Sequence, residues 1–322
     1  MKSFVVGKND AGQRMDRFIS KAAPALPTAL MHKYIRKKYI KIDRKRCEAG
    51  TRLVEGSVIE MYIPDEFFVQ KEPEYDFLHA SKNINIVYED QNIILIDKPQ
   101  GLLVHPDDHE YRDTLIARIQ RYLYEKGEFD PAKENSFRPA LANRIDRNTG
   151  GIVIAAKNAE ALRILCEKIK SRELTKKYLA VVHGTPKKRE DTLTDYLLKD
   201  ADNNQVYIKS RAASGAAESI THYKVIKSQN NLSLLDVTIL TGRTHQIRAQ
   251  MAAAGHPLLG DGKYGKTGDA KSIGYKRQAL YSYLLGFEFK TPAGQLEYLN
   301  GRVFKVKECW FAKELFGYDI KD

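Results

Sequence analysis

The chain has 322 residues, of which 43% are hydrophobic and 29% are charged. This balance excludes a largely disordered polypeptide, and the length favours more than one globular domain. The net charge is +12, and most of the excess lies in residues 1–64, which hold 14 basic and 6 acidic residues. Such asymmetry fits either an anionic partner, most commonly nucleic acid, or a basic face that only contacts water.

The cysteines and the apolar runs exclude further classes of protein. Cys47, Cys166 and Cys309 are far apart and no C-x-x-C pair exists, which argues against a structural zinc site and a redox dithiol. The start of the chain, MKSFVVGKND, lacks the apolar stretch of a signal peptide. No run reaches the roughly 18 apolar residues of a membrane-spanning helix. We therefore expect a cytoplasmic protein with no metal and no membrane contact.

Residues 1–66 are predicted to form a small domain of two helices and a hairpin. Met15, Phe18 and Ile19 recur at helical spacing, and Pro27 suits the start of a second helix. Short strands should follow at KYIKI and SVIEMYI, with a turn at DRKRC. In the second helix, PTALMHKYIRKK, the side chains expected to face inward are Leu30, Met31 and Tyr34.

The end of that second helix and the hairpin after it are densely basic. Eight cations fall within the fourteen residues from position 33 to position 46. The helix dipole favours the cations at the helix end, but it does not explain those that follow. Cations at this density repel one another unless phosphates lie nearby. We therefore predict an RNA-binding surface, here named the basic cluster, made of Lys33, Arg36, Lys37, Lys38, Arg44, Lys45 and Arg46.

Residues 67–82 are polar and irregular, and they are interpreted as a linker to a second domain at residues 83–322. In that domain the predicted strands are INIVYED, NIILIDKP, KKYLAVVHG and LSLLDVTIL. The predicted helices are RDTLIARIQRYLYEK, EALRILCEKIKSRE and THQIRAQMAAAG. Strands dominate and the helices are interspersed irregularly, which predicts an α+β fold rather than a doubly wound sheet.

Asp146 lies in a turn that contains glycine, ALANRIDRNTGG, ahead of an apolar run at residues 152–156. An Asp in such a turn is most often a local cap. Arg144 and Arg147 favour a second interpretation, because neighbouring cations favour the ionised carboxylate. An ionised carboxylate can act as a nucleophile without a neighbouring base. Its natural target is an electron-poor carbon, such as the anomeric carbon of a sugar.

Two further stretches contain candidate functional residues. In TGRTHQIRAQ, Arg243 falls at the start of a predicted helix, where a cation is mildly unfavourable unless an anion lies nearby. His245 is a poor candidate metal ligand, because the spacing to its nearest histidine, His256, does not suit a zinc pair. In KKYLAVVHG, Tyr178 is either an ordinary strand residue or a ring that stacks on a base and lends its hydroxyl to proton transfer.

Together and in this order, these stretches resemble the RluA-type pseudouridine synthases. That family carries His-Arg-Leu-Asp-x-x-Thr-Ser-Gly where this chain has NRIDRNTGG, and Lys-x-Tyr-Leu-Ala where it has KKYLA. The Thr-Gly-Arg-Thr-His-Gln-Ile-Arg motif is unbroken at residues 241–248, and GHPLLGDGKYG follows from Gly255. The departures from the first motif are Asn143 for His, Ile145 for Leu and Gly150 for Ser.

The resemblance implies a pseudouridine synthase fold, with a mainly antiparallel mixed sheet and flanking helices around a basic cleft. Residues 1–66 are similar in arrangement to the alpha-L type RNA-binding domain, with a hairpin turn at Asp43-Arg44 where Asn-Gly is usual. The implied reaction isomerises uridine to pseudouridine in structured RNA, ribosomal or transfer, without a cofactor or a metal. We expect the protein to act as a monomer.

The resemblance also implies roles for individual residues. Asp146 would be the nucleophile, and Arg243 would pair with it. Tyr178 would stack on the target base and take part in removing the proton from its carbon 5. Besides the basic cluster, the residues expected to contact RNA are Arg144, Arg147, Thr149, His245 and Arg248.

Two alternatives belong to other functional classes. A non-catalytic RNA-binding or ribosome-assembly factor would keep the same fold, but the intact Asp146, Tyr178 and Arg243 argue against it. A metal-dependent nuclease would need an acidic cluster for two cations, which the sequence lacks. The sequence leaves open whether Asp146 forms a covalent adduct or acts through a glycal-type intermediate.

Overall fold

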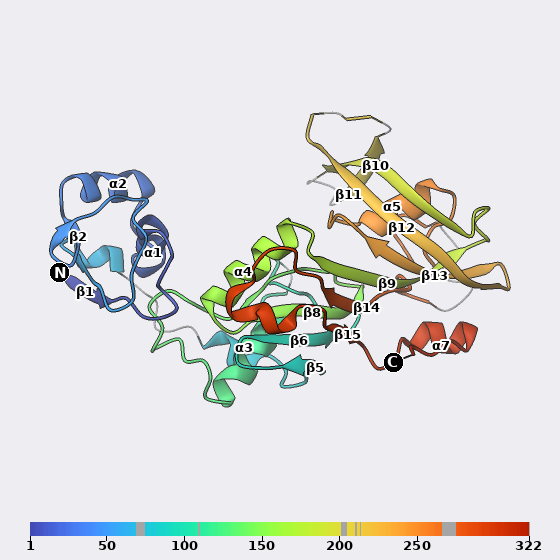
Figure 1. Cartoon of the computed structure of the whole chain (residues 1–322), viewed down its shortest axis with the longest axis horizontal. Helices are drawn as coiled ribbons and strands as arrows, with labels where there is room; N and C mark the ends of the chain where they lie inside the picture. The colour runs from blue at the N-terminus through green and yellow to red at the C-terminus, as the bar shows by residue number, and fades with distance from the viewer. Residues whose placement is uncertain are drawn as a thin grey trace.

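The described part of the chain forms two β-sheets with separate hydrophobic cores. Figure 1 shows the smaller sheet and its two helices set apart at one end of an elongated molecule. This arrangement comes from a computed structural model of the chain. The residues that the structure describes are 1–68, 75–108, 110–200, 205–209, 211–212, 214–265 and 275–321.

The N-terminal unit packs helices α1 and α2 against a four-stranded sheet of order β1-β4-β2-β3. On α1, Met15, Phe18 and Ile19 are buried as predicted. On α2 the buried residues are Met31 and Ile35, whereas the predicted Leu30 and Tyr34 lie only at the edge of this core. The elements are β1 (Lys2–Val5), α1 (Met15–Ala22), α2 (Thr28–Arg36), β2 (Ile40–Ile42), β3 (Lys45–Arg46), β4 (Val58–Met61) and the 3-10 helix η1 (Asp65–Phe68).

The hairpin between β2 and β3 presents part of the basic cluster on a tight turn. Asp43 and Arg44 both have positive φ, 49° and 63°, which is the backbone that Asn-Gly usually supplies in two-residue hairpins. The Asp43 carboxylate accepts a 2.7 Å hydrogen bond from the backbone nitrogen of Val58, which anchors the turn to β4. The predicted turn, DRKRC, is therefore shorter than expected, because β3 already begins at Lys45.

The predicted linker at residues 67–82 is only partly described, because residues 69–74 lie outside the described part of the chain. Phe68 is buried in the core of the N-terminal unit. Phe77, in the 3-10 helix η2 (Asp76–His79), and Ala80 are buried in a core of the larger unit. Both ends of the predicted linker are thus packed, and the boundaries at 66 and 83 stay a prediction.

The larger sheet has eleven strands and is almost entirely antiparallel. Its main path is β11-β10-β12-β13-β9-β14-β8-β6-β5, with β15 on β14 and β7 on β8. Among the described pairs, only β14 with β8 is parallel, so the predicted α+β class with a mainly antiparallel mixed sheet is confirmed. The strands are β5 (Ile86–Glu89), β6 (Ile93–Lys98), β7 (Ala140–Leu141), β8 (Gly150–Ala156), β9 (Leu174–His183), β10 (Glu190–Asp200), β11 (Gln205–Lys209), β12 (Ala216–Gln229), β13 (Leu232–Ile239), β14 (Leu280–Phe287) and β15 (Val303–Lys305).

Helices cover both faces of this sheet around β6 and β8 (Figure 1). α3 packs Leu115 and Ile119 on one face, and α4 packs Leu165 on the other. The side chains of Thr114 and Asn158 cap the first turns of these two helices. Within the described ranges, no helix combines the length and the apolar character needed to cross a bilayer. The helices are α3 (Leu115–Glu125), α4 (Ala159–Lys170), α5 (Gln246–Ala253), α7 (Trp310–Phe316) and the 3-10 helix η3 (Gly294–Leu299).

A polar interface joins the two units through the loop that precedes α1. Asp10 is 2% exposed, and its carboxylate accepts hydrogen bonds from the side chains of Asn135 and Ser136. Asn9 accepts a hydrogen bond from the backbone nitrogen of Ala159, at the start of α4. These contacts lie near the carboxyl end of β8, because α4 follows that strand directly. The N-terminal unit therefore docks at the opposite end of β8 from Asp146.

Candidate active site

Asp146 lies on a tight turn at the entrance to the fully buried strand β8. The backbone nitrogen of Thr149 donates to the carbonyl of Asp146 at 3.0 Å, which closes the turn. The Asp146 side chain keeps a quarter of its surface exposed. The turn thus presents a carboxylate to solvent from a rigid base, because all seven residues of β8 are buried.

Arg248 holds this carboxylate in place. Its Nη1 donates to Asp146 Oδ2 at 2.9 Å, while its Nε and Nη2 donate to both carboxylate oxygens of Asp261 at 2.7 and 2.9 Å. Arg243 was predicted to be this partner, and that prediction is wrong. Its Nε donates instead to the backbone carbonyl of Glu218 at 3.1 Å. The reason is local: α5 begins at Gln246, so Arg243 lies in the turn before it, whereas Arg248 is carried inside the helix to Asp146.

Arg248 and Asp261 shift each other's pKa. Burial alone would lower the pKa of Arg248, but hydrogen bonds and charges from Asp261 and Asp146 outweigh it and raise that pKa. Burial would likewise raise the pKa of Asp261, and the hydrogen bonds from Arg248 outweigh it and lower that pKa. The Arg248 guanidinium and the Asp261 carboxylate are therefore both charged, and the guanidinium is fixed as a two-sided clamp.

Tyr178 lies on β9 beside the same turn. It is 6% exposed, pairs across the sheet with Ser282 of β14, and shares a hydrogen bond with that serine. Burial raises the pKa of the Tyr178 hydroxyl to about 12, and the negative charge of Asp146 acts in the same direction. The hydroxyl is therefore neutral near pH 7.

Lys98 is fully buried beneath the Asp146 turn, and sequence reasoning missed it. Its ammonium donates to the backbone carbonyls of Pro99, Leu102 and Arg147 at 2.8 to 3.0 Å. Burial lowers the pKa of Lys98 to about 7, while the charge of Asp146 opposes that shift. A signal was present in the sequence, because strand alternation puts Lys98 on the same buried face as Ile94 and Ile96.

His245 closes the other side of the site. Its Nε2 lies 3.9 Å from Asp146 Oδ2, and its Nδ1 is 3.0 Å from the hydroxyl of Tyr264. Tyr264 also supports the Arg248 guanidinium with its ring face, 5.3 Å from the ring centroid. Burial lowers the pKa of His245. Sequence reasoning quoted the GDGKYG stretch but gave Asp261 and Tyr264 no role, although both contact the site.

Two departures from the family motif have structural explanations. The Asn143 side chain accepts a 2.8 Å hydrogen bond from the backbone nitrogen of Ile154, so it supports β8. A Cβ at Gly150 would lie 2.3 Å from the ring of Tyr281, which packs on this position. Tyr281 is itself fixed by a hydrogen bond to Asp97. A serine at position 150 would therefore require the core to move.

The remaining predicted residues lie in two places. Arg144 and Arg147 flank Asp146 on the exposed side of the turn, and Arg147 Nε donates to the carbonyl of Gly101. Thr149 is buried and accepts a hydrogen bond from Gln278. All seven residues of the basic cluster are exposed, and Arg36 and Arg46 line a hollow beside α2. Their roles toward RNA stay a prediction.

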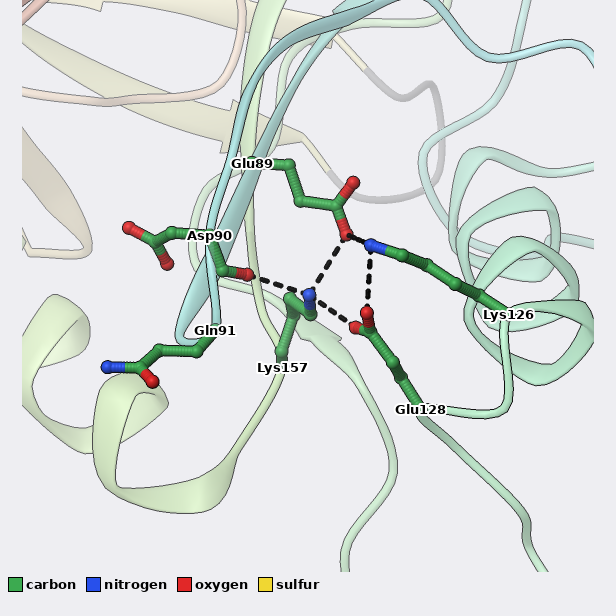
Figure 2. A pocket seen from close by; sticks show the side chains of 6 residues that line it. All are labelled: Glu89, Asp90, Gln91, Lys126, Glu128 and Lys157. Carbon is green, nitrogen blue, oxygen red and sulfur yellow. Dashed lines mark hydrogen bonds and ion pairs between the residues drawn. The ribbon is translucent and has the colours of Figure 1, made fainter.

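A second hollow lies at the far end of β8 and is closed by ion pairs. Figure 2 shows Lys126 and Lys157 between the carboxylates of Glu89 and Glu128. Lys157 also donates to the carbonyl of Asp90 at 2.7 Å. Two cations thus neutralise two anions, and the cluster ties the β5–β6 turn and the end of α3 to β8. Across the described residues, no three His, Cys, Asp or Glu side chains are grouped as metal ligands.

Comparisons with known proteins agree with this geometry. Residues 92–253 match the family model described as RNA pseudouridylate synthase. An RNA pseudouridine synthase of Mycoplasma capricolum is 30% identical over 97% of this chain and 100% of its own length. Ribosomal large subunit pseudouridine synthase C of Vibrio vulnificus is 29% identical, over 89% of this chain and 88% of its own.

Solved structures show the same fold. Human RNA pseudouridylate synthase domain containing 4 superposes with a TM-score of 0.54 at 20% identity, covering 69% of this chain and 88% of the human one. The match of half the chain to the family model, with a relative 30% identical over nearly all of it, shows the family. The chain belongs to the RNA pseudouridylate synthase family and is an RNA pseudouridine synthase.

Proposed function

We propose that this enzyme isomerises uridine in ribosomal RNA with Asp146 as its attacking carboxylate. In this reaction the bond from ribose carbon 1′ to the base nitrogen breaks, the base turns, and a bond from carbon 1′ to carbon 5 forms. The hydrogen on carbon 5 leaves as a proton, and the ring nitrogen freed from carbon 1′ takes up a proton, so the product is an isomer of uridine. The observation that carries the proposal is the Asp146 carboxylate, solvent-accessible yet clamped by Arg248 at 2.9 Å.

The role of Arg248 in the proposal is to aim Asp146. The Arg248 guanidinium is fixed by its two hydrogen bonds to Asp261. It therefore holds the Asp146 carboxylate oxygen at one position. Holding a reacting group in place lowers the barrier by avoiding reorganisation during the reaction. The ion pair predicted for Arg243 belongs to Arg248, and we propose Arg243 as a substrate-binding residue of the site.

The role of Tyr178 in the proposal is to support the base and take part in the transfer of the carbon 5 proton. Tyr178 lies on β9, close to the turn that carries Asp146. A flat aromatic ring stacks well on an unstacked uracil. With a pKa of about 12, its hydroxyl is neutral near pH 7. It therefore acts as a hydrogen-bond donor or as one step of a proton relay. The target nucleotide must leave its stack, and the basic cluster contributes binding free energy for that step.

Ribosomal RNA is proposed as the substrate because relatives are named ribosomal large subunit pseudouridine synthases C and D. We further propose that the enzyme acts in the cytoplasm and as a monomer, because a single chain brings Asp146, Tyr178 and Arg248 together. The test maps pseudouridines in ribosomal and transfer RNA from cells that lack the protein. The same cells are then supplied with the wild-type chain or with Asp146→Asn.

The expected result is loss of one or more pseudouridines from large-subunit ribosomal RNA, restored by the wild type and not by Asp146→Asn. Losses confined to transfer RNA would contradict the substrate but not the reaction. An unchanged map, or restoration by Asp146→Asn, would contradict the proposed function.

A further inference from the structure

Lys176 is a half-buried cation without an anionic partner, two residues before Tyr178. Strand alternation puts the two side chains on the same face of β9, about 7 Å apart along the strand. Its neighbour Lys177 points to the opposite face, where its ammonium pairs with Asp236 at 3.2 Å. Among the described residues, no hydrogen bond or ion pair reaches the ammonium of Lys176, and burial lowers its pKa.

The turn that carries Arg243 lies against this ammonium. The nearest atom to a Cβ placed at Gly242 would be Lys176 Nζ, at 3.9 Å. Arg243 is exposed, and among the described residues its side chain donates only to the neutral backbone carbonyl of Glu218. The Glu218 carboxylate pairs with Arg172 at 3.9 Å. Within the described chain, the Lys176 ammonium thus lies beside the turn that carries Arg243, and neither side chain is paired with a carboxylate.

Two cations without a carboxylate partner at the edge of an active site favour an anionic ligand. A phosphate is such an anion, and its oxygens accept from both an ammonium and a guanidinium. The contrast with Lys177 is informative, because the neighbouring strand β13 supplies a carboxylate partner, Asp236, on the face turned away from Tyr178. Only the cation on the Tyr178 face is left for a ligand.

We propose that Lys176 and Arg243 bind one backbone phosphate of the RNA, at or next to the target nucleotide. This inference rests on the proposed function and extends it, since it names the contact that would hold an unstacked nucleotide while Tyr178 and Asp146 meet its base and ribose. The pair anchors the backbone on the β9 side of the site, and Arg144 and Arg147, which are close to Asp146 in sequence, are exposed as well.

The experiment measures RNA affinity and single-turnover pseudouridine formation for the full chain and for Lys176→Met, Arg243→Met and Lys177→Met. The RNA is a hairpin that contains the target uridine. Loss of one charged hydrogen bond to phosphate should weaken binding by Lys176→Met and by Arg243→Met about tenfold to a hundredfold. The salt slope of affinity should fall by about 0.7 to 0.9 for the one lost phosphate.

Lys177→Met is the matched control, with the same chemistry on the other face of the strand. Its affinity should stay within about threefold of the wild type, and thermal unfolding of all variants separates folding defects from binding defects. Equal loss in Lys176→Met and Lys177→Met would overturn the proposal, because it would trace the effect to the strand rather than to a phosphate.

Neutral methylphosphonate linkages, placed singly on either side of the target uridine, identify the phosphate. At the contacted position the wild type should lose at least as much affinity as Lys176→Met does, and adding Lys176→Met to that neutral linkage should cost nothing more. Losses that add at every position would overturn the phosphate site. Because affinity is measured directly, the test of the phosphate site does not depend on enzyme activity. A wild type that binds the RNA but forms no pseudouridine would contradict the proposed function and not the phosphate site.

Discussion

The basic cluster of the N-terminal unit and Arg248 of the active site place the same kind of charge in opposite surroundings. The seven cations of the cluster are exposed, and in the described chain none has an ion-pair or side-chain hydrogen-bond partner within the protein. Arg248 is buried and donates to two carboxylates at once. Exposed, unpaired cations attract phosphate at long range and in a salt-dependent way, whereas a buried pair fixes geometry and is little affected by salt.

This difference suggests that the two units of the chain have different functions. The N-terminal unit contributes affinity for RNA, and the buried network around Asp146 contributes the chemistry. The polar interface at Asp10 joins the two parts at the end of β8 away from Asp146. A substitution in one part should therefore change a different measured quantity from a substitution in the other.

The largest effect is expected from Arg248→Lys. Lysine keeps the positive charge but cannot donate to Asp261 and Asp146 in a fixed fork. The single-turnover rate at saturating RNA should fall roughly 100-fold, the equivalent of about 2.7 kcal/mol. Arg14→Lys is the matched control, because Arg14 makes the same type of pair with Asp16 on the exposed surface of the N-terminal unit. A comparable rate loss in both variants would contradict the role of Arg248.

The next effect concerns the buried Lys98 and depends on pH. Its pKa is about 7 in the folded chain, against an ordinary value of 10.5. Between these values the unfolded chain binds one proton more, so stability rises with pH. Relative to Lys98→Met, the wild type should gain up to about 1.4 kcal/mol of unfolding free energy per pH unit from about pH 7 upward, and nothing below it. Urea unfolding from pH 6 to 9.5 measures this difference, and parallel curves would contradict the lowered pKa of Lys98.

A smaller effect is expected from Gly150→Ser, which restores the residue usual in the family. Its Cβ would meet the Tyr281 ring at 2.3 Å, and overpacking of this kind costs about 1 to 3 kcal/mol. Gly50→Ser is the control, because no atom lies within 4 Å of its Cβ position. Thermal unfolding compares the two. A Gly150→Ser protein as stable as the control would mean that Tyr281 moves freely.

The smallest change in RNA-binding free energy per substituted residue is expected from substitutions in the basic cluster. If the seven cations supply about four phosphate contacts, their replacement by glutamine should flatten the salt slope of affinity by about three units. Lys290→Gln and Lys307→Gln, exposed lysines outside the cluster, are the controls. Affinity measured over a range of salt concentrations decides the matter, and an unchanged slope would mean that the cluster contacts only water.

Amphipathic pattern was sufficient to predict the parts of the fold that have one clear apolar face. α1, with Met15, Phe18 and Ile19 inward, is such a case. β10 and β12 were missed because charged and polar residues interrupt their apolar pattern, and in β10 only Leu197 is buried. β14 was missed because all but one of its residues are buried, a run without the alternation that marks a strand.

The motifs were sufficient to locate the candidate site, but the pairings within it could not be predicted. Asp146 and Tyr178 were identified from motifs, and the structure brings them together. The choice between Arg243 and Arg248 depended on where α5 begins, and the left-handed backbone of His245 delays that start. Asp261 was out of reach, because its only signal is a hydrogen bond to Arg248 in the folded chain. A local pattern does not reveal which distant carboxylate an arginine meets.

Tritium release from RNA labelled at carbon 5 of uridine, in single turnover at saturating RNA, tests the different functions of the two units most directly. The account predicts no release by Asp146→Asn and a rate within about threefold of the wild type for the seven-glutamine variant of the basic cluster. Release by Asp146→Asn near the wild-type rate would contradict the attacking carboxylate. A collapsed rate in the cluster variant would mean that the N-terminal unit helps to build the active site.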